Sequence, residues 1–407
     1  MAGPLHGVRV LDLTRILAGP WTTQALADLG ADVIKIEKPQ EGDDTRKMGP
    51  PWIMERETGR IVDAAYFASC NRGKRSVTID FSRTEGQELV HRLASISDVL
   101  VENYKVGGLA KFGLDYEPMH RLYPRLVYCS ITGFGQTGPY RDRPGYDFLA
   151  QGMGGLMSVT GEPDGAPGGG PQKTGVALAD ILAGLYASTA IIAALYSRNA
   201  NGAGQYIDIA LLDAQVATLA NQAMNYLIGG VVPRRMGNAH PTIVPYQTFV
   251  ASDGHIIVAV GNDKQFAHFC EVINRPELAD DDRFRSFATR SANRHILVPM
   301  LEELIRKRSC AEWIAALENA GLPCGPINTI DKVFEDPQVK ARGLRLDLPH
   351  PRAGTVPSIS SPMRFSETQA EYTLGPPMLG QHTDEVLRDL LGLGSEEMEA
   401  LRARHIV

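Results

Sequence analysis

The sequence lacks most of the signals that mark secreted, membrane-spanning or nucleic-acid-binding proteins. Its five cysteines are scattered singly, with an odd total and no paired spacing, which argues against a disulfide framework and against a metal site. It has no block of Lys or Arg, and its net charge of −6 argues against nucleic acid as a partner. The chain enters a strand-like segment at residues 8–13 without a signal or transit peptide, and the apolar run 181–195 is too short to span a bilayer. We therefore expect a soluble cytoplasmic protein with reduced thiols.

The usual nucleotide-binding motifs are also missing. After the first predicted strand the chain reads Thr14-Arg-Ile-Leu-Ala-Gly-Pro20, which is not a Gly-x-Gly-x-x-Gly turn and so argues against NAD. A glycine cluster at 164–171 has no Gly-Lys-Ser/Thr ending, so it is not a phosphate loop. The sequence predicts no permanently bound cofactor.

What is present is an ordinary globular composition with a clear alternation of strands and helices. The 407 residues are 43% hydrophobic and 22% charged, which is enough for a sizeable core. Buried strands are predicted at 7–13, 31–37, 76–80, 98–102 and 126–131, with helical segments between them. This βαβ alternation is typical of a parallel sheet, so we predict an α/β fold with a large Rossmann-like domain.

The pattern changes after a further strand at 204–212 and a long predicted helix at 213–228. Gly229-Gly230 and Pro233 interrupt the chain, and the segments 245–250 and 255–260 flank Ser-Asp-Gly as in a hairpin. Helices follow, which predicts a smaller α+β domain. The expected division is 1–228 for the first part of the large domain, 229–330 for the small domain and 331–407 for a C-terminal part.

One stretch, residues 175–195, is a long apolar run of good helix formers with a single carboxylate, Asp180. A helix that is apolar on all sides is expected to be buried, and a buried carboxylate is costly unless something pairs with it or uses it. Asp180 is expected in the first turn or two, where free N–H groups and the helix dipole favour an anion. From this stretch alone, a bracing role and a chemical role for Asp180 are equally supported.

Several motifs, in order along the chain, resemble the family III CoA-transferases, which include formyl-CoA and carnitine CoA-transferases. They are Leu13-Thr-Arg-Ile-Leu-Ala-Gly-Pro20, Gly30-Ala-Asp-Val-Ile-Lys-Ile-Glu37, Asn71-Arg-Gly-Lys-Arg-Ser76, Val101-Glu-Asn-Tyr104, Gly145-Tyr-Asp147, Ala179-Asp180, Gly321-Leu-Pro-Cys-Gly-Pro326 and Leu379-Gly-Gln-His-Thr-Asp384. The resemblance runs from Leu5 nearly to the C-terminus. A narrower likeness to the group that moves CoA from succinyl-CoA to dicarboxylates such as glutarate rests on 42–46, 128–133, 225–229 and 243–247.

The resemblance implies a reaction, an assembly and a nucleophile. It implies that both ends of the chain contribute to the large domain and that two protomers form an interlocked homodimer. It places the family's catalytic aspartate on Asp180, which would form a mixed anhydride and then an aspartyl-CoA thioester. Coenzyme A would be a moiety of the substrate, and the partners would be an acyl-CoA and a carboxylic acid.

The resemblance also implies a set of residues around CoA. They are Arg15, Ile16, Lys38, Arg72, Lys74, Arg75, Asn103, Tyr104 and Lys111. Cations suit the phosphates of CoA, and an aliphatic or aromatic edge suits the adenine. Each Lys or Arg alone is more often a solvated surface charge, so only the whole set of residues supports a CoA site.

Five further residues are candidates for the substrate side of the site. Arg46 or Arg72 would clamp the free carboxylate of a dicarboxylate, although Arg46 is equally explained by a loop salt bridge to Asp43 or Asp44. The backbone of Gly261 and Asn262 is a candidate for stabilising oxyanions. The remaining two are His240, which is more often structural when it stands alone, and Tyr146.

Two rival functions remain at this stage. An α-methylacyl-CoA racemase would use a His–Asp pair, but Tyr146 stands where that His is expected, and tyrosine is a poor general base at neutral pH. A non-catalytic CoA-binding subunit would have no need to keep a carboxylate such as Asp180 in an apolar helix.

Overall fold

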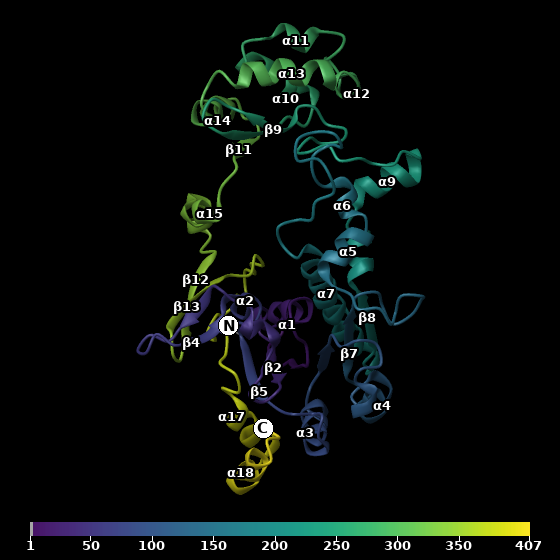
Figure 1. Ribbon diagram of the computed structural model, residues 1–407, viewed down its shortest axis with the longest axis vertical. Helices are drawn as coiled ribbons and strands as arrows, with labels where there is room; N and C mark the ends of the chain where they lie inside the picture. The colour runs from purple at the N-terminus through teal and green to yellow at the C-terminus, as the bar shows by residue number, and fades with distance from the viewer. Residues whose placement is uncertain (1–2) are drawn as a thin grey trace. The chain divides into compact units, whose positions relative to one another are not determined.

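Six parallel strands form the sheet that the alternating pattern predicts (Figure 1). The computed structural model describes residues 3–407. The sheet has the order β5-β2-β1-β6-β7-β8. The strands are β1 Arg9–Asp12, β2 Asp32–Glu37, β5 Lys74–Thr78, β6 Val99–Glu102, β7 Val127–Thr132 and β8 Tyr206–Ala210. The order reverses between β1 and β6, which is the switch point where α/β sheets bind ligands, at the carboxyl ends of the strands.

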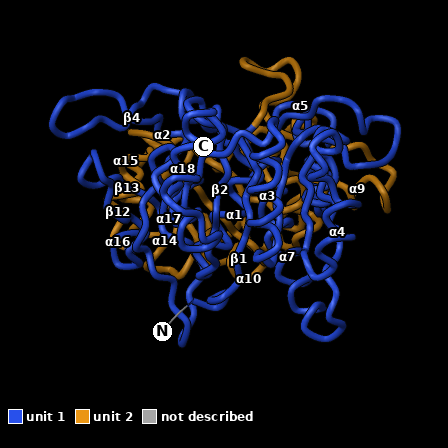
Figure 2. Tube along the Cα trace, turned by 90° about the horizontal axis from the view of Figure 1, so that it is seen from below, with its two compact units in different colours: residues 1–156, 174–221, 338–407 blue, residues 157–173, 222–337 orange. Residues whose placement is uncertain are grey.

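Helices cover both faces of this sheet, as a parallel sheet with buried faces requires. One face packs on residues of α1 (Ala18–Asp28), α5 (Asp147–Met153), α7 (Leu178–Asn201) and α8 (Leu211–Ala217). The other packs on α3 (Thr84–Ser95), α4 (Tyr116–Leu122), α17 (Thr383–Leu391) and α18 (Ser395–Ala403). The sheet and these helices belong to one compact unit, unit 1, which comprises 1–156, 174–221 and 338–407 (Figure 2).

The apolar helix α7 is both longer and less enclosed than its sequence predicts. It spans 24 residues, so its length and composition alone would allow it to cross a membrane. The prediction that the apolar run is too short to do so was therefore wrong. One side is buried against the sheet through Ala179, Ala183, Ala187 and Ile191, which accounts for much of its apolar composition. The opposite side exposes the large apolar side chains Leu185, Tyr186, Ile192 and Tyr196, so the expectation of burial on all sides does not hold within one chain.

Unit 2 comprises 157–173 and 222–337, drawn in orange in Figure 2. It is built around a small antiparallel sheet. The predicted hairpin is confirmed as β9 (Tyr246–Val250) and β10 (His255–Ala259), and β11 (Cys324–Pro326) joins β10. The helices here are α9 Ala220–Gly229, α10 Asp263–Val272, α11 Glu277–Asp280, α12 Phe287–Ala292, α13 Arg294–Ile305, α14 Cys310–Asn319 and α15 Ile330–Glu335. Of these, α10, α11, α13 and α14 form the core with the sheet.

Two details of the chain's division differ from the sequence pattern. Residues 157–173 belong with unit 2, because Gly237 N donates to Gly161 O and Arg235 pairs with Asp164. The long helix expected at 213–228 is two helices, α8 and α9, separated where Ala220 takes a positive φ of 45°. Local helix propensity extends across this break, so the sequence pattern does not reveal it.

The remaining elements are short and were mostly unpredicted. They are η1 Asp44–Lys47, β3 Trp52–Met54, β4 Ile61–Ala64, α2 Ala65–Ser69, η2 Ala110–Phe112, α6 Leu156–Val159, α16 Pro337–Ala341, β12 Arg345–His350 and β13 Gly354–Ile359. The C-terminal segment is bound to the edge strand β5: His382 N donates to Ser76 O at 2.9 Å, and Thr78 N donates to Thr383 Oγ1 at 3.0 Å.

Candidate active site

Asp180 lies in the first turn of α7, as the sequence predicts. In the described chain its carboxylate accepts no hydrogen bond and has no cationic partner, although it is partly buried. Burial, and then the nearby negative charge of Asp147, raise the pKa of Asp180 to about 7. An unpaired buried carboxylate is costly, so its presence here indicates a group that is kept for chemistry.

A polar network fixes the start of α7 and hence the position of Asp180. Asp147, at the start of α5, accepts a hydrogen bond from Ala179 N at 2.8 Å. Its second oxygen accepts from Gln151 Nε2 at 2.8 Å, and Gln151 Oε1 accepts from Thr174 N at 3.0 Å. The segment that leads into α7 is therefore tied to α5 from both ends.

Tyr66, from α2, also lies near this carboxylate. Burial, and then the charges of Asp180 and other acids, raise the pKa of its phenol to about 12. A phenol that stays protonated can donate a hydrogen bond to charge that develops beside it. Tyr66 and Asp147 were not predicted as site residues, although Asp147 lies inside a motif that the sequence analysis singled out.

At the switch point, four of the predicted CoA residues come together. Arg15 and Ile16 follow β1, and Asn103 and Tyr104 follow β6. Asn103 Oδ1 accepts from Arg15 N at 2.9 Å, and the Arg15 guanidinium lies 5.1 Å from the centre of the Tyr104 ring. The juxtaposition arises because β1 and β6 are neighbours whose carboxyl ends share one edge.

Lys38 and Lys111 lie at the same edge. The exposed Lys38 follows β2 and pairs with Glu41 at 2.6 Å. Lys111 lies over Phe112, which packs on Phe81, and Phe81 packs in turn on the Tyr104 ring at 6.0 Å. Phe81 was not predicted. It comes just after β5, and its position after a parallel strand was the available signal.

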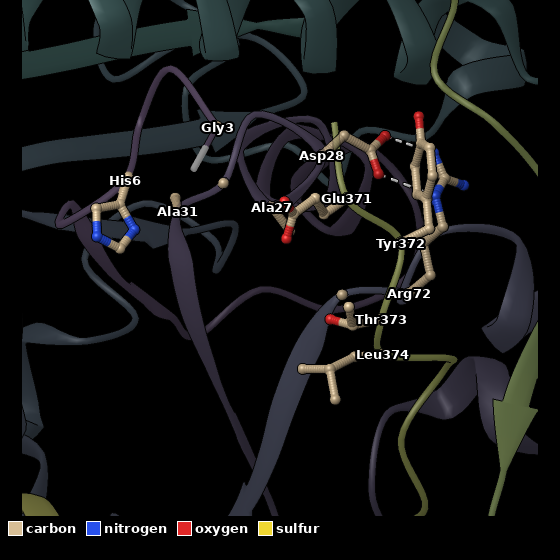
Figure 3. Close-up of a pocket in the computed structure, with 12 residues that line it drawn as sticks. Gly3, His6, Ala27, Asp28, Ala31, Arg72, Glu371, Tyr372, Thr373 and Leu374 are labelled. Carbon is tan, nitrogen blue, oxygen red and sulfur yellow. Dashed lines mark hydrogen bonds and ion pairs between the residues drawn. The ribbon is translucent and has the colours of Figure 1, made fainter. Parts of the chain in front are cut away.

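Arg72, Lys74 and Arg75, which were also predicted as CoA contacts, lie elsewhere in unit 1 and pair with acidic side chains. They stand at or before the start of β5, so they face the opposite edge of the sheet or its interior. Arg72 pairs with Asp28 in a cavity of about 380 Å³, where Figure 3 shows the carboxylate facing the guanidinium. Lys74 is fully buried, and its Nζ lies 3.2 Å from Asp12.

Arg75 completes this group at the amino end of the strands. Its guanidinium pairs with Asp32, the first residue of β2, at 2.6 Å and with Glu385 at 3.2 Å. The cations of the segment 71–76 therefore bond to acidic side chains of unit 1.

Arg46 is committed to the fold. It is buried, its Nη2 lies 2.7 Å from Glu37 and its Nη1 lies 2.9 Å from Asp63. Both Nη atoms also donate to Pro377 O, so every N–H group is occupied. The salt-bridge partners of Arg46 are therefore Glu37 and Asp63 and not the predicted Asp43 or Asp44, and its role as a substrate clamp stays a prediction.

Three predicted substrate residues lie in unit 2. His240 Nδ1 accepts from Thr242 N and Ile243 N at 3.2 and 3.0 Å, which is a structural role for that nitrogen. Asn262 is the N-cap of α10. Gly261 N donates to Gln265 Oε1 at 2.8 Å, so this amide is occupied in the structure.

Tyr146, in unit 1, is the N-cap residue of α5 and is 70% exposed. It lies one residue before Asp147, and within this chain its ring is exposed to solvent.

Comparisons with known proteins agree on one family. The model of CoA-transferase family III matches residues 5–383. The chain is 50% identical over 387 residues to a succinate–glutarate CoA-transferase of Agrobacterium fabrum, covering 95% of this chain and 96% of the relative. It is 42% identical over 388 residues to the succinyl-CoA:glutarate CoA-transferase of Homo sapiens, covering 95% and 86%. A crystal structure of a CAIB/BAIF family protein from Brucella suis is 52% identical, with a TM-score of 0.85 over 96% of this chain and 100% of that one.

Proposed function

Because the chain belongs to CoA-transferase family III, we propose that it moves CoA from succinyl-CoA to a dicarboxylic acid such as glutarate. The observation that carries the chemistry is Asp180, a partly buried carboxylate with no partner in the part of the chain that the structure describes. The choice of substrates is supported by the relatives named above. Their identity is high over nearly the whole chain.

Asp180 acts as the nucleophile. Its ionised carboxylate attacks the thioester carbonyl of succinyl-CoA, and the C–S bond breaks to give a mixed anhydride and the CoA thiolate. The thiolate then attacks the Asp180 carbonyl of the anhydride, which releases succinate and leaves an aspartyl-CoA thioester. The acceptor carboxylate attacks this thioester, and the thiolate returns to the acceptor's carbonyl, which regenerates Asp180. Each step exchanges one acyl bond for another, so no nucleotide hydrolysis is needed.

The first turn of α7 suits this sequence of steps. The helix dipole at this end of α7 favours the ionised nucleophile, while burial opposes ionisation. The outcome is the raised pKa near 7, so a substantial fraction of Asp180 is ionised at neutral pH. Arg15, Ile16, Asn103 and Tyr104 at the switch point provide the surface for CoA, joined by Lys38 and Lys111.

The reaction is tested by the products that it forms. Incubation of the enzyme with succinyl-CoA and a panel of glutarate, malate, itaconate, mesaconate and monocarboxylates is expected to give new dicarboxyl-CoA thioesters, detected by mass. Hydroxylamine added during turnover is expected to inactivate the enzyme by trapping the Asp180 acyl intermediate. Deuterium wash-in at the α-carbon of a chiral acyl-CoA, without CoA transfer, would instead indicate a racemase.

The functional assembly is an interlocked homodimer, as the family resemblance implies. In unit 1, the exposed side of α7 carries Leu185, Tyr186, Ile192 and Tyr196, with Tyr196 79% exposed. An apolar cavity of about 840 Å³ in the same unit includes Leu185 in its lining. Large exposed apolar surfaces of this kind are typical of protein interfaces.

We expect light scattering to give the mass of a dimer for the wild type. Tyr196→Asp combined with Ile192→Asp is expected to weaken the dimer, because it places two charges in a surface that the partner would desolvate. Leu122→Asp is the matched control: Leu122 is 59% exposed on α4 and its variant is expected to remain dimeric. A wild type that is monomeric at micromolar concentration would contradict the assembly.

A further inference from the structure

The turn that joins β1 to α1, residues 14–16, has an unusual backbone conformation. Ile16 has a φ of +70°, in the left-handed region that β-branched residues rarely adopt. Such a conformation persists only where the surroundings impose it. The turn stands at the switch point of the sheet, where Arg15 and Ile16 are placed to meet CoA.

Side chains bond all six backbone polar groups of this turn. The three N–H groups donate as follows: Thr14 N to Asp12 Oδ1 at 2.8 Å, Arg15 N to Asn103 Oδ1 at 2.9 Å and Ile16 N to Asp43 Oδ1 at 3.2 Å. The three carbonyls accept as follows: Thr14 O from Lys35 Nζ at 2.8 Å, Arg15 O from Asn103 Nδ2 at 2.6 Å and Ile16 O from Cys70 Sγ at 3.6 Å. The shape of the turn is thus imposed from outside.

Asn103 differs from the other groups of this set. Its side-chain amide accepts from the N–H of Arg15 and donates to the C=O of Arg15, as the backbone of a neighbouring strand would. It therefore links the segment after β6 to the segment after β1. It is neutral and partly exposed. Lys35 and Asp43, in contrast, are buried and paired with each other at 3.0 Å, so removing either leaves a buried charge unpaired and disturbs the fold.

We propose that Asn103 is a positioning residue for the acyl-CoA substrate, acting through the Thr14–Ile16 turn. Its side-chain oxygen and nitrogen are both used on the backbone of Arg15, so it holds Arg15 and Ile16 in the shape that meets the CoA moiety. The inference deepens the proposed function and rests on it, since Arg15 and Ile16 are CoA contacts only if the protein binds acyl-CoA.

The size of the effect follows from the strain at Ile16. Asn103 supplies two of the six side-chain bonds of the turn. Without them the turn is held less firmly, so Ile16 is freer to take negative φ, which a residue with a branched Cβ favours by roughly tenfold. The fraction of molecules in which the turn has the shape that binds CoA then falls, and the apparent affinity for CoA falls by the same factor. For Asn103→Ala we expect the Kd for free CoA and the KM for succinyl-CoA to rise about tenfold. The kcat and the thermal midpoint are expected to stay close to those of the wild type.

Asn201→Ala is the matched control. Asn201 also bonds a backbone group, accepting from Ala203 N at 3.0 Å, but at the far end of α7. Its variant is expected to leave the Kd for CoA unchanged. An Asn103→Ala variant with lowered thermal midpoint and unchanged Kd would show a structural role only and would overturn the proposal.

A double-mutant cycle with Ile16→Gly separates positioning from direct contact. Glycine takes positive φ about as readily as negative φ, so Asn103→Ala in this background is expected to raise the Kd for CoA only about twofold. An equal factor in both backgrounds would mean that Asn103 acts independently of the turn, which contradicts the proposal. A wild type that fails to bind CoA would show, before any variant is made, that the proposed function itself is wrong.

Discussion

Replacing Asp180 by Asn is expected to abolish CoA transfer and at the same time to stabilise the fold. The amide cannot form the anhydride, so transfer should fall by at least about 10³-fold. The variant also removes a partly buried charge that has no partner among residues 3–407. We expect free CoA to bind with unchanged affinity, because Asp180 is not among the proposed CoA contacts.

The stabilisation should depend on pH in a defined direction. The pKa of Asp180 is raised from 3.8 to about 7 by folding. Below pH 3.8 the group is protonated in both the folded and unfolded states, so wild type and Asp180→Asn should unfold alike. As the pH rises towards 7, the wild type progressively loses stability relative to the variant, on the order of 2–4 kcal/mol above pH 7. Melting curves at pH 5 and pH 8.5 measure this difference.

Asp213→Asn is the control for this experiment. Asp213 lies in the first turn of α8, as Asp180 lies in that of α7, but it is exposed. Its replacement should change neither transfer nor the pH dependence of stability. Near-normal turnover by Asp180→Asn would exclude the covalent mechanism, and a variant less stable than the wild type at pH 8.5 would show that Asp180 braces the helix.

Arg46→Met is expected to be severely destabilised. Arg46 is buried between Glu37 and Asp63, and its loss leaves both carboxylates without their principal cation. Breaking a buried ion pair in this way costs about 3–5 kcal/mol, so denaturant unfolding should shift strongly towards lower concentration. Soluble expression is expected to fall as well.

Two comparisons make the result interpretable. Arg388→Met removes an exposed pair with Asp389 and should cost less than about 1 kcal/mol. Neutralising the acids together with Arg46, as Glu37→Gln and Asp63→Asn, should recover part of the loss, because no buried charge is then left unpaired. If Arg46→Met kept wild-type stability and raised only the KM for the dicarboxylate, Arg46 would be a substrate clamp after all.

The sequence predicts the sheet and the position of Asp180 well for a physical reason. Buried parallel strands such as 126–131 are mostly apolar runs, and they are visible without knowledge of their neighbours. Asp180 is conspicuous because a lone carboxylate interrupts an apolar helix. Both signals are local, so one chain read in order is sufficient to find them.

The roles of individual cations were harder to predict, because they depend on partners distant in sequence. Arg72 pairs with Asp28 at the end of α1, and Lys74 pairs with Asp12 at the end of β1. No spacing rule reveals those pairs, so a motif rich in Arg and Lys looked like a phosphate site. Tyr66 was missed for the same reason, since its proximity to Asp180 exists only after folding.

The bonding of the Thr14–Ile16 turn has a consequence for how its sequence can change. Its path is determined by Asp12, Lys35, Asp43, Cys70 and Asn103, none of which lies within the turn. The side chains of Arg15 and Ile16 are not needed for those backbone bonds, so this position can be remodelled for other ligands while the chain keeps its course. Engineering of ligand preference would therefore best begin at Arg15, with Asn103 and the buried Lys35–Asp43 pair left untouched.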